Sequence, residues 1–277
     1  MQEFVDPRGA PSQRRQRRGG GQNTASFDPH TTMHRPDIRV VVHPTGVPIK
    51  TISADDLALI HGAITPSALG DQYTTVKELL PRMLDETRDM VAQNTADAQF
   101  TSWHEGCHLL AKQLPPTAVR IAAFLMEMFD VDPKTAAVRY NFYNGQSDWK
   151  ALHHDSAAFN AQRARVQNVT IGASFGDTRE LILQHTKGAD VRIPCTDGSV
   201  YMFGRSVNIR FMHGIAAIPE EERDDTKRRV SIIVWGNSRK LQDEPGDPGL
   251  IRQEGSSRPH AHRRRRGRNE RRKDEPT

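Results

Sequence analysis

The 277-residue sequence contains few cysteines and no long hydrophobic runs. Its two cysteines, Cys107 and Cys195, are too few for a small domain held together by several disulfide bonds. No stretch approaches the roughly 18 to 20 consecutive apolar residues that a membrane-spanning helix requires, so we expect no membrane association. The first residues also lack the apolar segment of a secretory signal. These absences predict an intracellular protein, in the nucleus or cytoplasm, with reduced thiols.

Charge is abundant but unevenly distributed, although the formal net charge is only +5. Residues 1–25 carry five arginines against two acids, and residues 250–277 carry ten basic residues against four acids. This leaves residues 26–249 with a net charge of −4. Both ends are polar and lack apolar periodicity, so they cannot bury enough surface to fold. We therefore expect a disordered Arg/Gly-rich tail over residues 1–35, one folded domain over residues 36–241, and a disordered Arg-rich tail over residues 242–277.

Short strands separated by turn residues dominate the second half of the predicted domain. Asn144-Gly145 and Asp197-Gly198 are examples of the turn signals. The predicted strands cover residues 138–143, 150–155, 169–175, 180–184, 199–203, 209–213 and 229–235. So many short strands within about 100 residues predict an antiparallel sandwich or jelly-roll barrel over residues 136–241.

The first half of the predicted domain mixes strands with helices. Short strands are predicted over residues 38–42 and 47–52. Helical spacing of apolar residues predicts one helix over residues 75–91, which Pro81 kinks or divides, and another over residues 118–129 with Thr117 as its N-cap. The predicted fold class is therefore α+β, mainly β, with a double-stranded β-helix (jelly-roll) core and N-terminal helices packed on one sheet.

Three residues of the strand-rich half could form a metal site. In a strand, His153 and Asp155 would share one face about 6.6 Å apart. His213 lies in another predicted strand, which an antiparallel barrel could bring against this pair. Two histidines and one carboxylate can form the facial triad that binds non-haem Fe(II) and leaves coordination positions open. With 12 histidines and 21 aspartates in the chain, however, an H-x-D triplet is expected by chance about once.

Polar residues on neighbouring strands give the triplet more weight. One face of the preceding strand presents Arg139, Asn141 and Tyr143, and one face of the last strand presents Arg229, Ser231, Ile233 and Trp235. Because arginine pairs bidentately with carboxylates, a barrel interior of this kind could bind a dicarboxylate beside the metal. The alternative for Arg229 is a solvated charge after the acidic loop over residues 220–225.

Several stretches share the order and spacing of a known family. They are Asn141 to Gly145, His153-His154-Asp155, Ile171 to Gly176 with Arg179 and Leu181, Gly198 to Gly204, His213-Gly214-Ile215, and Arg229. Over about 100 residues the sequence thus resembles the AlkB-like Fe(II)/2-oxoglutarate dioxygenases. The resemblance implies that His153, Asp155 and His213 bind Fe(II). It also implies a 2-oxoglutarate site made by Asn141, Tyr143 and Arg229, with Arg229 on the distal carboxylate, and we place Ser231 in the same site.

The resemblance further implies an oxidoreductase that uses O₂ and converts 2-oxoglutarate to succinate and CO₂. Hydroxylation of an N-methyl group would release formaldehyde, so we predict oxidative demethylation of N-methylated DNA or RNA by a monomer, assisted by its basic tails. Two positions depart from the family pattern. Trp235 stands where a second arginine usually follows the first by six residues, and Ala157 stands where nucleic-acid demethylases can carry an acid.

Three other functions remain open from the sequence. Ala157 and the acidic folded domain favour a 2-oxoglutarate oxygenase that acts on protein side chains or small molecules. Trp235 in place of the second arginine favours a weakly catalytic adaptor that binds RNA. The segment His104-Glu105-Gly106-Cys107-His108 fits the H-E-x-x-H motif, which on a helix would place two histidines one turn apart for a zinc protease.

Overall fold

The computed structural model describes residues 38–65, 69–70, 73–92, 100–103, 106–109, 114–187 and 190–242. Apart from Gln242, the two predicted tails lie outside the described residues. In the described part of the chain, no helix has the length and apolar character needed to cross a bilayer.

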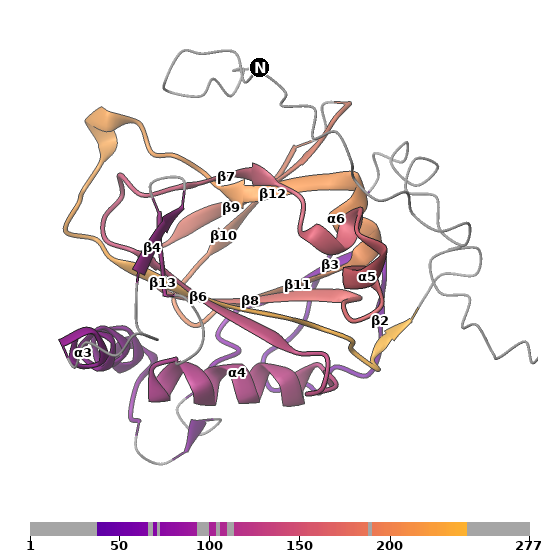
Figure 1. Cartoon of the computed structure of the whole chain (residues 1–277), viewed down its shortest axis with the longest axis horizontal. Coiled ribbons are helices and arrows are strands. Elements are labelled where there is room, and N and C mark those ends of the chain that lie inside the picture. The colour runs from indigo at the N-terminus through magenta and orange to yellow at the C-terminus, as the bar shows by residue number, and fades with distance from the viewer. Residues whose placement is uncertain are drawn as a thin grey trace, which may run out of the picture.

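Two β-sheets face each other and form the body of the molecule (Figure 1). The larger sheet has eight strands, in the order β1 (Arg39–Val42), β3 (Asp56–Ile60), β11 (Val200–Gly204), β8 (Val169–Gly176), β13 (Arg229–Gly236), β6 (Ala137–Tyr143), β5 (Gly106–Leu109) and β4 (Phe100–Trp103). The smaller sheet has four, in the order β10 (Asp190–Cys195), β9 (Arg179–His185), β12 (Phe211–Ile215) and β7 (Lys150–His153). All these pairings except β1 with β3 are antiparallel, which confirms the predicted jelly-roll core.

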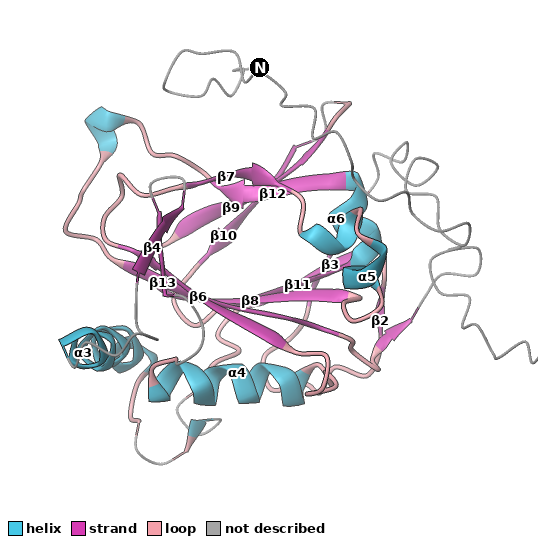
Figure 2. Ribbon diagram, viewed as in Figure 1, coloured by secondary structure: helices cyan, strands magenta, loops and turns pink. Residues whose placement is uncertain are grey.

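Short helices and a small strand pair complete the described structure (Figure 2). The helices are η1 (Val76–Glu78), α3 (Leu79–Ala92), α4 (Pro116–Met128), η2 (Ser156–Ala158), α5 (Ala161–Ala164), α6 (Arg205–Arg210) and η3 (Glu220–Glu222). Strands β2 (Ile52–Ser53) and β14 (Leu241–Gln242) pair in parallel. Helices α3 and α4 lie beneath the larger sheet, and α5 and α6 lie at one end of the two sheets (Figure 1).

Alternation along the strands gives the larger sheet two different faces. In β13, Val230, Ile232 and Val234 belong to the apolar cluster between the larger sheet and the helices, whereas the intervening residues face the smaller sheet. Ser231 pairs directly with Asn141 of β6, and Arg229 pairs with Tyr143. The same alternation therefore builds one apolar core under the larger sheet and, between the sheets, an interior in which polar residues adjoin a second apolar cluster.

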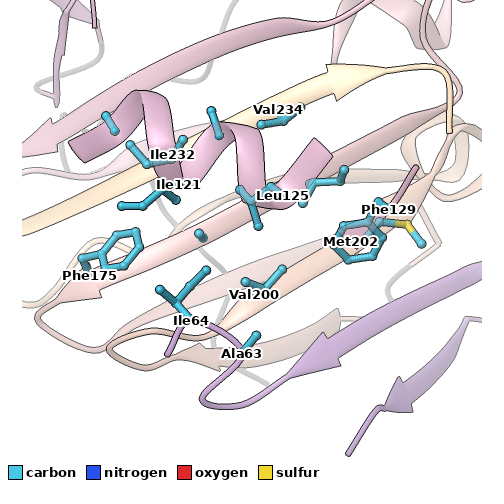
Figure 3. Close-up of a cluster of buried hydrophobic side chains, with 14 of the residues drawn as sticks. Ala63, Ile64, Ile121, Leu125, Phe129, Phe175, Val200, Met202, Ile232 and Val234 are labelled. Atoms are coloured by element: carbon cyan, nitrogen blue, oxygen red, sulfur yellow. The ribbon is translucent and has the colours of Figure 1, made fainter. Parts of the chain in front are cut away.

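Helix α4 covers the outer face of the larger sheet with a continuous apolar stripe. Ile121, Leu125 and Phe129 are fully buried in the same cluster as Ile232 and Val234 (Figure 3). Their spacing of four residues places the three side chains on one side of the helix. This packing fixes the helices against the larger sheet and leaves the interior between the sheets for other residues.

The boundaries of several elements differ from the prediction. Helix α4 begins at Pro116, so Thr117 is not its N-cap but lies inside the first turn, where it donates to Glu86 of α3. Pro81 lies in the first turn of α3, a position without an intrahelical donor to lose, and therefore does not divide the helix. The predicted strand over residues 47–52 is reduced to the two-residue strand β2.

Some elements were absent from the prediction. Strand β10 contains Pro194, which weakens a strand signal in sequence but is tolerated because β10 lies at the edge of the smaller sheet. Helix α6 extends to Arg210, so the strand predicted over residues 209–213 begins only at Phe211. Strand β3 was also missed, although all five of its residues are buried.

Candidate metal centre and co-substrate pocket

His153 and His213 meet across two neighbouring strands of the smaller sheet. His153 ends β7, His213 lies in the middle of β12, and the two residues are direct partners in the antiparallel register. Their ring centroids are 4.4 Å apart. Strand pairing thus brings together two imidazoles that are 60 residues apart in the sequence.

Asp155 reaches the two histidines from outside the strand. The prediction that Asp155 shares a strand face with His153 is wrong, because β7 ends at His153 and Asp155 is the residue before η2. Its Oδ1 lies 4.0 Å from Nε2 of His153 and 3.7 Å from Nε2 of His213. The three potential ligand atoms all lie within 4.8 Å of one another. Ligand atoms that bind one metal ion at about 2.1 Å lie roughly 3 to 4 Å apart, so small side-chain movements would suffice.

Hydrogen bonds hold the Asp155 carboxylate in this orientation. Its Oδ2 accepts from Oγ1 of Thr170 at 2.7 Å and from Nε1 of Trp235 at 2.9 Å. The side chain of Asn208 accepts from the Asp155 N–H at 2.8 Å and donates to the Asp155 carbonyl at 3.2 Å. Oδ2 and the backbone are therefore held by protein groups, and Oδ1 is left facing the histidines.

Burial and polar neighbours shift the pKa values of the three residues. Burial opposes ionisation of Asp155, but His213, His153 and the two hydrogen bonds outweigh it and hold the carboxyl pKa below its usual range. Burial lowers the pKa of His153 to about 4 and that of His213 well below its ordinary value. At neutral pH the site therefore presents one carboxylate and two neutral imidazoles, which are the protonation states that bind metals.

The tautomer of His153 can be assigned from its hydrogen bond. Nδ1 lies 2.9 Å from the carbonyl oxygen of Ala151, which can only accept, so Nδ1 carries the proton. Nε2 then keeps its lone pair on the side of Asp155. A ligating histidine commonly donates its other N–H to a carbonyl in this way.

A small pocket opens beside the triad. It is lined by Asn141, Tyr143, Lys150, His153, Asp155, Thr170, Leu181, Tyr201, His213, Gly214, Ile215, Ser231, Ile233 and Trp235. The side chains of Asn141 and Ser231 are joined by a hydrogen bond of 3.1 Å. The pocket thus brings three of the predicted co-substrate residues, Asn141, Tyr143 and Ser231, together with the candidate metal centre.

Arg229 lies behind this pocket with part of its guanidinium unsatisfied. The residue is only 1% exposed, so the alternative of a solvated charge is wrong. Its Nε donates to Oγ of Ser174 at 2.9 Å, and the guanidinium lies over the ring of Tyr143, 4.8 Å from the centroid. Nη1 and Nη2 are buried without a hydrogen-bond partner among the described residues. A buried cation with two free donors in a planar fork matches the two oxygens of a carboxylate.

Sequence reasoning missed several residues that line the pocket. Tyr201 lies opposite Gly172 in the register of β11 and β8, and a side chain at Gly172 would begin 2.2 Å from the tyrosine ring. The glycine therefore leaves room for Tyr201 to lie across β8. Only knowledge of the strand register could have paired these two residues. Thr170 and Lys150 were also missed, because neither belongs to the motifs that marked the site.

The alternative metal motif around His108 does not form the predicted structure. Residues Gly106–Leu109 form strand β5, in which His108 pairs with Asn141 of β6, whereas the motif requires a helix. His104 and Glu105 lie outside the described residues. Within the described part of the chain, one cluster of histidine and acidic side chains is close enough to hold a metal ion, and it is the triad. The zinc-protease alternative is therefore wrong.

Comparison with known proteins gives structural matches of low similarity. No protein-family model matches the sequence, and no curated protein matches it either. A prolyl hydroxylase from Trichoplax adhaerens, solved with a hypoxia-inducible factor peptide, has 11% identity and a TM-score of 0.42, covering 66% of this chain and 84% of that one. A Pseudomonas putida prolyl-4-hydroxylase has 11% identity and a TM-score of 0.39, covering 61% and 91%.

A third solved structure, OsALKBH1, has 12% identity and a TM-score of 0.42, covering 65% of this chain and 97% of that one. At these identities, and with TM-scores below 0.5, the matches do not identify an activity or a substrate for this chain.

Proposed function

We propose that the protein is an Fe(II)- and 2-oxoglutarate-dependent dioxygenase. The observation that carries this proposal is the buried Arg229 guanidinium, whose two Nη atoms are free, behind the pocket that contains His153, Asp155 and His213. A metal triad alone fits many ions and reactions. A triad combined with an unpaired buried cation fits a metal together with an anionic co-substrate.

The donor set is suited to Fe(II). Two neutral imidazoles and one carboxylate on one side of an ion leave the opposite positions open for a co-substrate and O₂. Bound iron and 2-oxoglutarate supply the oxidising chemistry, in which the co-substrate is decarboxylated to succinate and CO₂ while O₂ is reduced and the substrate is hydroxylated. The protein's own contribution is to bind, orient and shield these groups.

The three triad residues, Arg229 and Tyr143 each have a defined task in this proposal. His153 and His213 offer their Nε2 lone pairs, and Asp155 adds a negative charge that balances part of the metal charge. Arg229 pairs with the distal carboxylate of 2-oxoglutarate through Nη1 and Nη2. Tyr143 covers the guanidinium and keeps water from the ion pair, which strengthens it.

A test of this activity is succinate formation from 2-oxoglutarate by the Fe(II)-loaded protein. We expect slow turnover without substrate, and its loss in His153→Ala and Asp155→Ala. His61→Ala and Asp190→Ala are matched controls, because both residues are exposed and neither lines the pocket. Absence of turnover in the wild type, or turnover that survives both triad substitutions, would contradict the proposal.

For the substrate we propose N-methylated nucleic acid, with oxidative demethylation as the reaction. This finer proposal is supported by the AlkB-like order of motifs and by the Arg-rich ends, whose charge can bind phosphates. The alternative is hydroxylation or demethylation of a protein or small molecule. It is favoured by Ala157, a buried residue at the position where nucleic-acid demethylases can carry an acid.

Formaldehyde release distinguishes these substrates. Methylated oligonucleotides, methylated nucleosides and methylated peptides are compared for coupled formaldehyde and succinate production. We expect the oligonucleotides to be preferred, with a rate that falls steeply with salt in the full chain and less steeply after deletion of residues 1–35 and 243–277. Preference for peptides or nucleosides would favour the alternative.

A further inference from the structure

Lys150 is a cation in the pocket that neither the sequence motifs nor the proposed function uses. It begins β7, three residues before His153, and both residues line the pocket. Side chains three residues apart in a regular strand point to opposite faces. Here, however, His153 pairs with His213 while Lys150 pairs with Ile215, so three steps along β7 match two steps along β12. This bulge brings both side chains to the same pocket.

The neighbourhood of Lys150 contains more positive than negative charge. Arg139 and Arg229 repel its ammonium group, and Asp155 is the acid that attracts it. Burial, followed by the effect of Arg139, lowers the Lys150 pKa to about 8, so the group is still mostly protonated at pH 7. No described residue accepts a hydrogen bond from the ammonium. A second anion in the pocket would therefore relieve the imbalance around Lys150.

Asp155 cannot satisfy Lys150 while it serves the metal centre. Its Oδ2 already accepts from Thr170 and Trp235, and its Oδ1 faces the two histidines. Trp235 also occupies the position where the family pattern has a second arginine. Its indole N–H is committed to Asp155, so β13 has no cation to offer a ligand at this end of the pocket.

Strand pairing places Lys150 at the metal end of the pocket. It lies in the same strand as His153 and pairs with Ile215, two residues after His213, whereas Arg229 belongs to the other sheet. A dicarboxylate whose distal group binds Arg229 would extend from the guanidinium towards the triad, and its other carboxylate would then approach Lys150.

We propose that Lys150 binds the carboxylate of 2-oxoglutarate that adjoins the 2-oxo group, replacing the arginine that β13 lacks. The inference rests on the proposed function, because it assumes 2-oxoglutarate as the co-substrate. Arg229 and Lys150 then each hold one end of the molecule. Binding requires no covalent step, and the bulge in β7 is what makes the second contact possible.

The test measures ligand affinity in the Mn(II)-loaded full chain by calorimetry without turnover. The ligands are 2-oxoglutarate and 2-oxopentanoate, which keeps the 2-oxo carboxylate but lacks the distal one. Lys150→Met is expected to weaken both ligands by about 10- to 100-fold, the loss typical of a hydrogen bond between charged groups. Arg229→Met is expected to weaken 2-oxoglutarate by a similar factor and to change the affinity for 2-oxopentanoate by less than about threefold. Lys134→Met, at an exposed lysine, serves as the control.

The outcomes separate this inference from the proposed function. No binding of 2-oxoglutarate by the wild type would overturn the proposed function itself. If Lys150→Met binds both ligands as tightly as the wild type, only the role of Lys150 is overturned. A loss of affinity for 2-oxoglutarate alone would also overturn that role, because it would place the lysine at the distal carboxylate. Weaker Mn(II) binding in Lys150→Met without any co-substrate would also overturn it, because the role would then be structural.

A measurement on the wild type covers the case in which Lys150→Met does not fold. Acetylation of individual lysines is followed by mass spectrometry with Mn(II), in the presence and absence of 2-oxopentanoate. We expect the ligand to protect Lys150 and to leave Lys134 unchanged. Equal acetylation of Lys150 with saturating ligand would overturn the inference.

Discussion

At the scale of the single residue, Trp235 shows how the residue type at one position decides whether it orients a metal ligand or pairs with a bound carboxylate. Its indole N–H donates to Oδ2 of Asp155, and its ring lies under the guanidinium of Arg139, 5.2 Å from the centroid. An arginine at position 235 could instead have paired with a bound carboxylate. With tryptophan there, the residue orients a metal ligand, and the positive charge must come from elsewhere in the pocket.

Substitution of Trp235 is therefore expected to affect metal binding. Trp235→Phe keeps an aromatic ring but removes the hydrogen bond to Asp155, and outer hydrogen bonds to metal ligands are typically worth 10- to 100-fold in affinity. Because Thr170 still donates to the same oxygen, we expect a loss of about tenfold, measured with Mn(II) by calorimetry. Trp149→Phe, at a buried tryptophan outside the pocket lining, is the control. Unchanged affinity in Trp235→Phe would refute this role.

At the scale of secondary-structure elements, the metal centre depends on how β7 ends. The strand stops at His153, and the chain turns into η2 so that Asp155 approaches both histidines from the side. Helix α6 fixes this turn, since its residue Asn208 makes two hydrogen bonds to the backbone of Asp155. The geometry of the carboxylate is thus set by a helix 53 residues further along the chain.

Asn208→Ala should lower both stability and metal affinity. The substitution leaves the buried Asp155 N–H without its partner and removes one of two donors to the Asp155 carbonyl, which still accepts from the N–H of Ala158. This loss costs about 1 to 3 kcal/mol in the free energy of unfolding and frees the Asp155 backbone to move. Urea unfolding and Mn(II) titration measure the two effects. Asn160→Ala also removes an asparagine that bonds two backbone groups, but these are at the start of α5. We expect Asn160→Ala to lower stability without changing Mn(II) affinity. If it weakened Mn(II) binding as much as Asn208→Ala does, the role of Asn208 in positioning Asp155 would be contradicted.

The strands were more predictable from the sequence than the connections between them. Period-two alternation correctly placed Asn141, Tyr143, Arg229 and Ser231 on faces turned towards the same interior. Alternation did not predict Lys150 as a pocket residue, because a bulge shifts the register of β7 and β12 between His153 and Lys150. Asn208 and Tyr201 depend on contacts between distant segments, and no local pattern in the sequence encodes those contacts.

At the scale of the whole molecule, the two faces of the larger sheet serve different purposes: one contributes to stability and the other to the pocket. Its outer face packs against α4, while its inner face lines the pocket. Leu125→Ala is expected to reduce the free energy of unfolding by about 2 to 5 kcal/mol through the cavity it leaves, measured by urea denaturation. Affinity for 2-oxoglutarate should stay unchanged under native conditions. Val119→Ala, on the exposed side of the same helix, should change stability by less than about 0.5 kcal/mol, and a similar loss at both positions would argue against this packing.

The metal-free molecule should become less stable as the solution is acidified. The pKa values of His153, His154 and His213 are all lowered, mainly by burial, and that of His153 is about 4. As the pH falls from about 7, through the unfolded histidine pKa of about 6.5, to about 4, the unfolded chain therefore binds more protons than the folded one, and stability falls.

Thermal unfolding with a chelator present, followed between pH 7 and pH 5, measures this effect. His153→Gln cannot titrate at that position and should lose less stability over this range than the wild type. His61→Gln, at an exposed histidine, should lose as much as the wild type. An unfolding temperature that does not change with pH would contradict the expected linkage.

The buried Arg229 guanidinium, whose two Nη atoms have no partner among the described residues, also affects how long the folded chain persists. A buried charge without a counterion strains the empty protein, and a bound dicarboxylate removes that strain. Ligand that binds only the folded state adds about 2.7 kcal/mol to stability at a hundredfold excess over its dissociation constant. The folded lifetime of the chain would then rise with the concentration of the dicarboxylate that Arg229 binds.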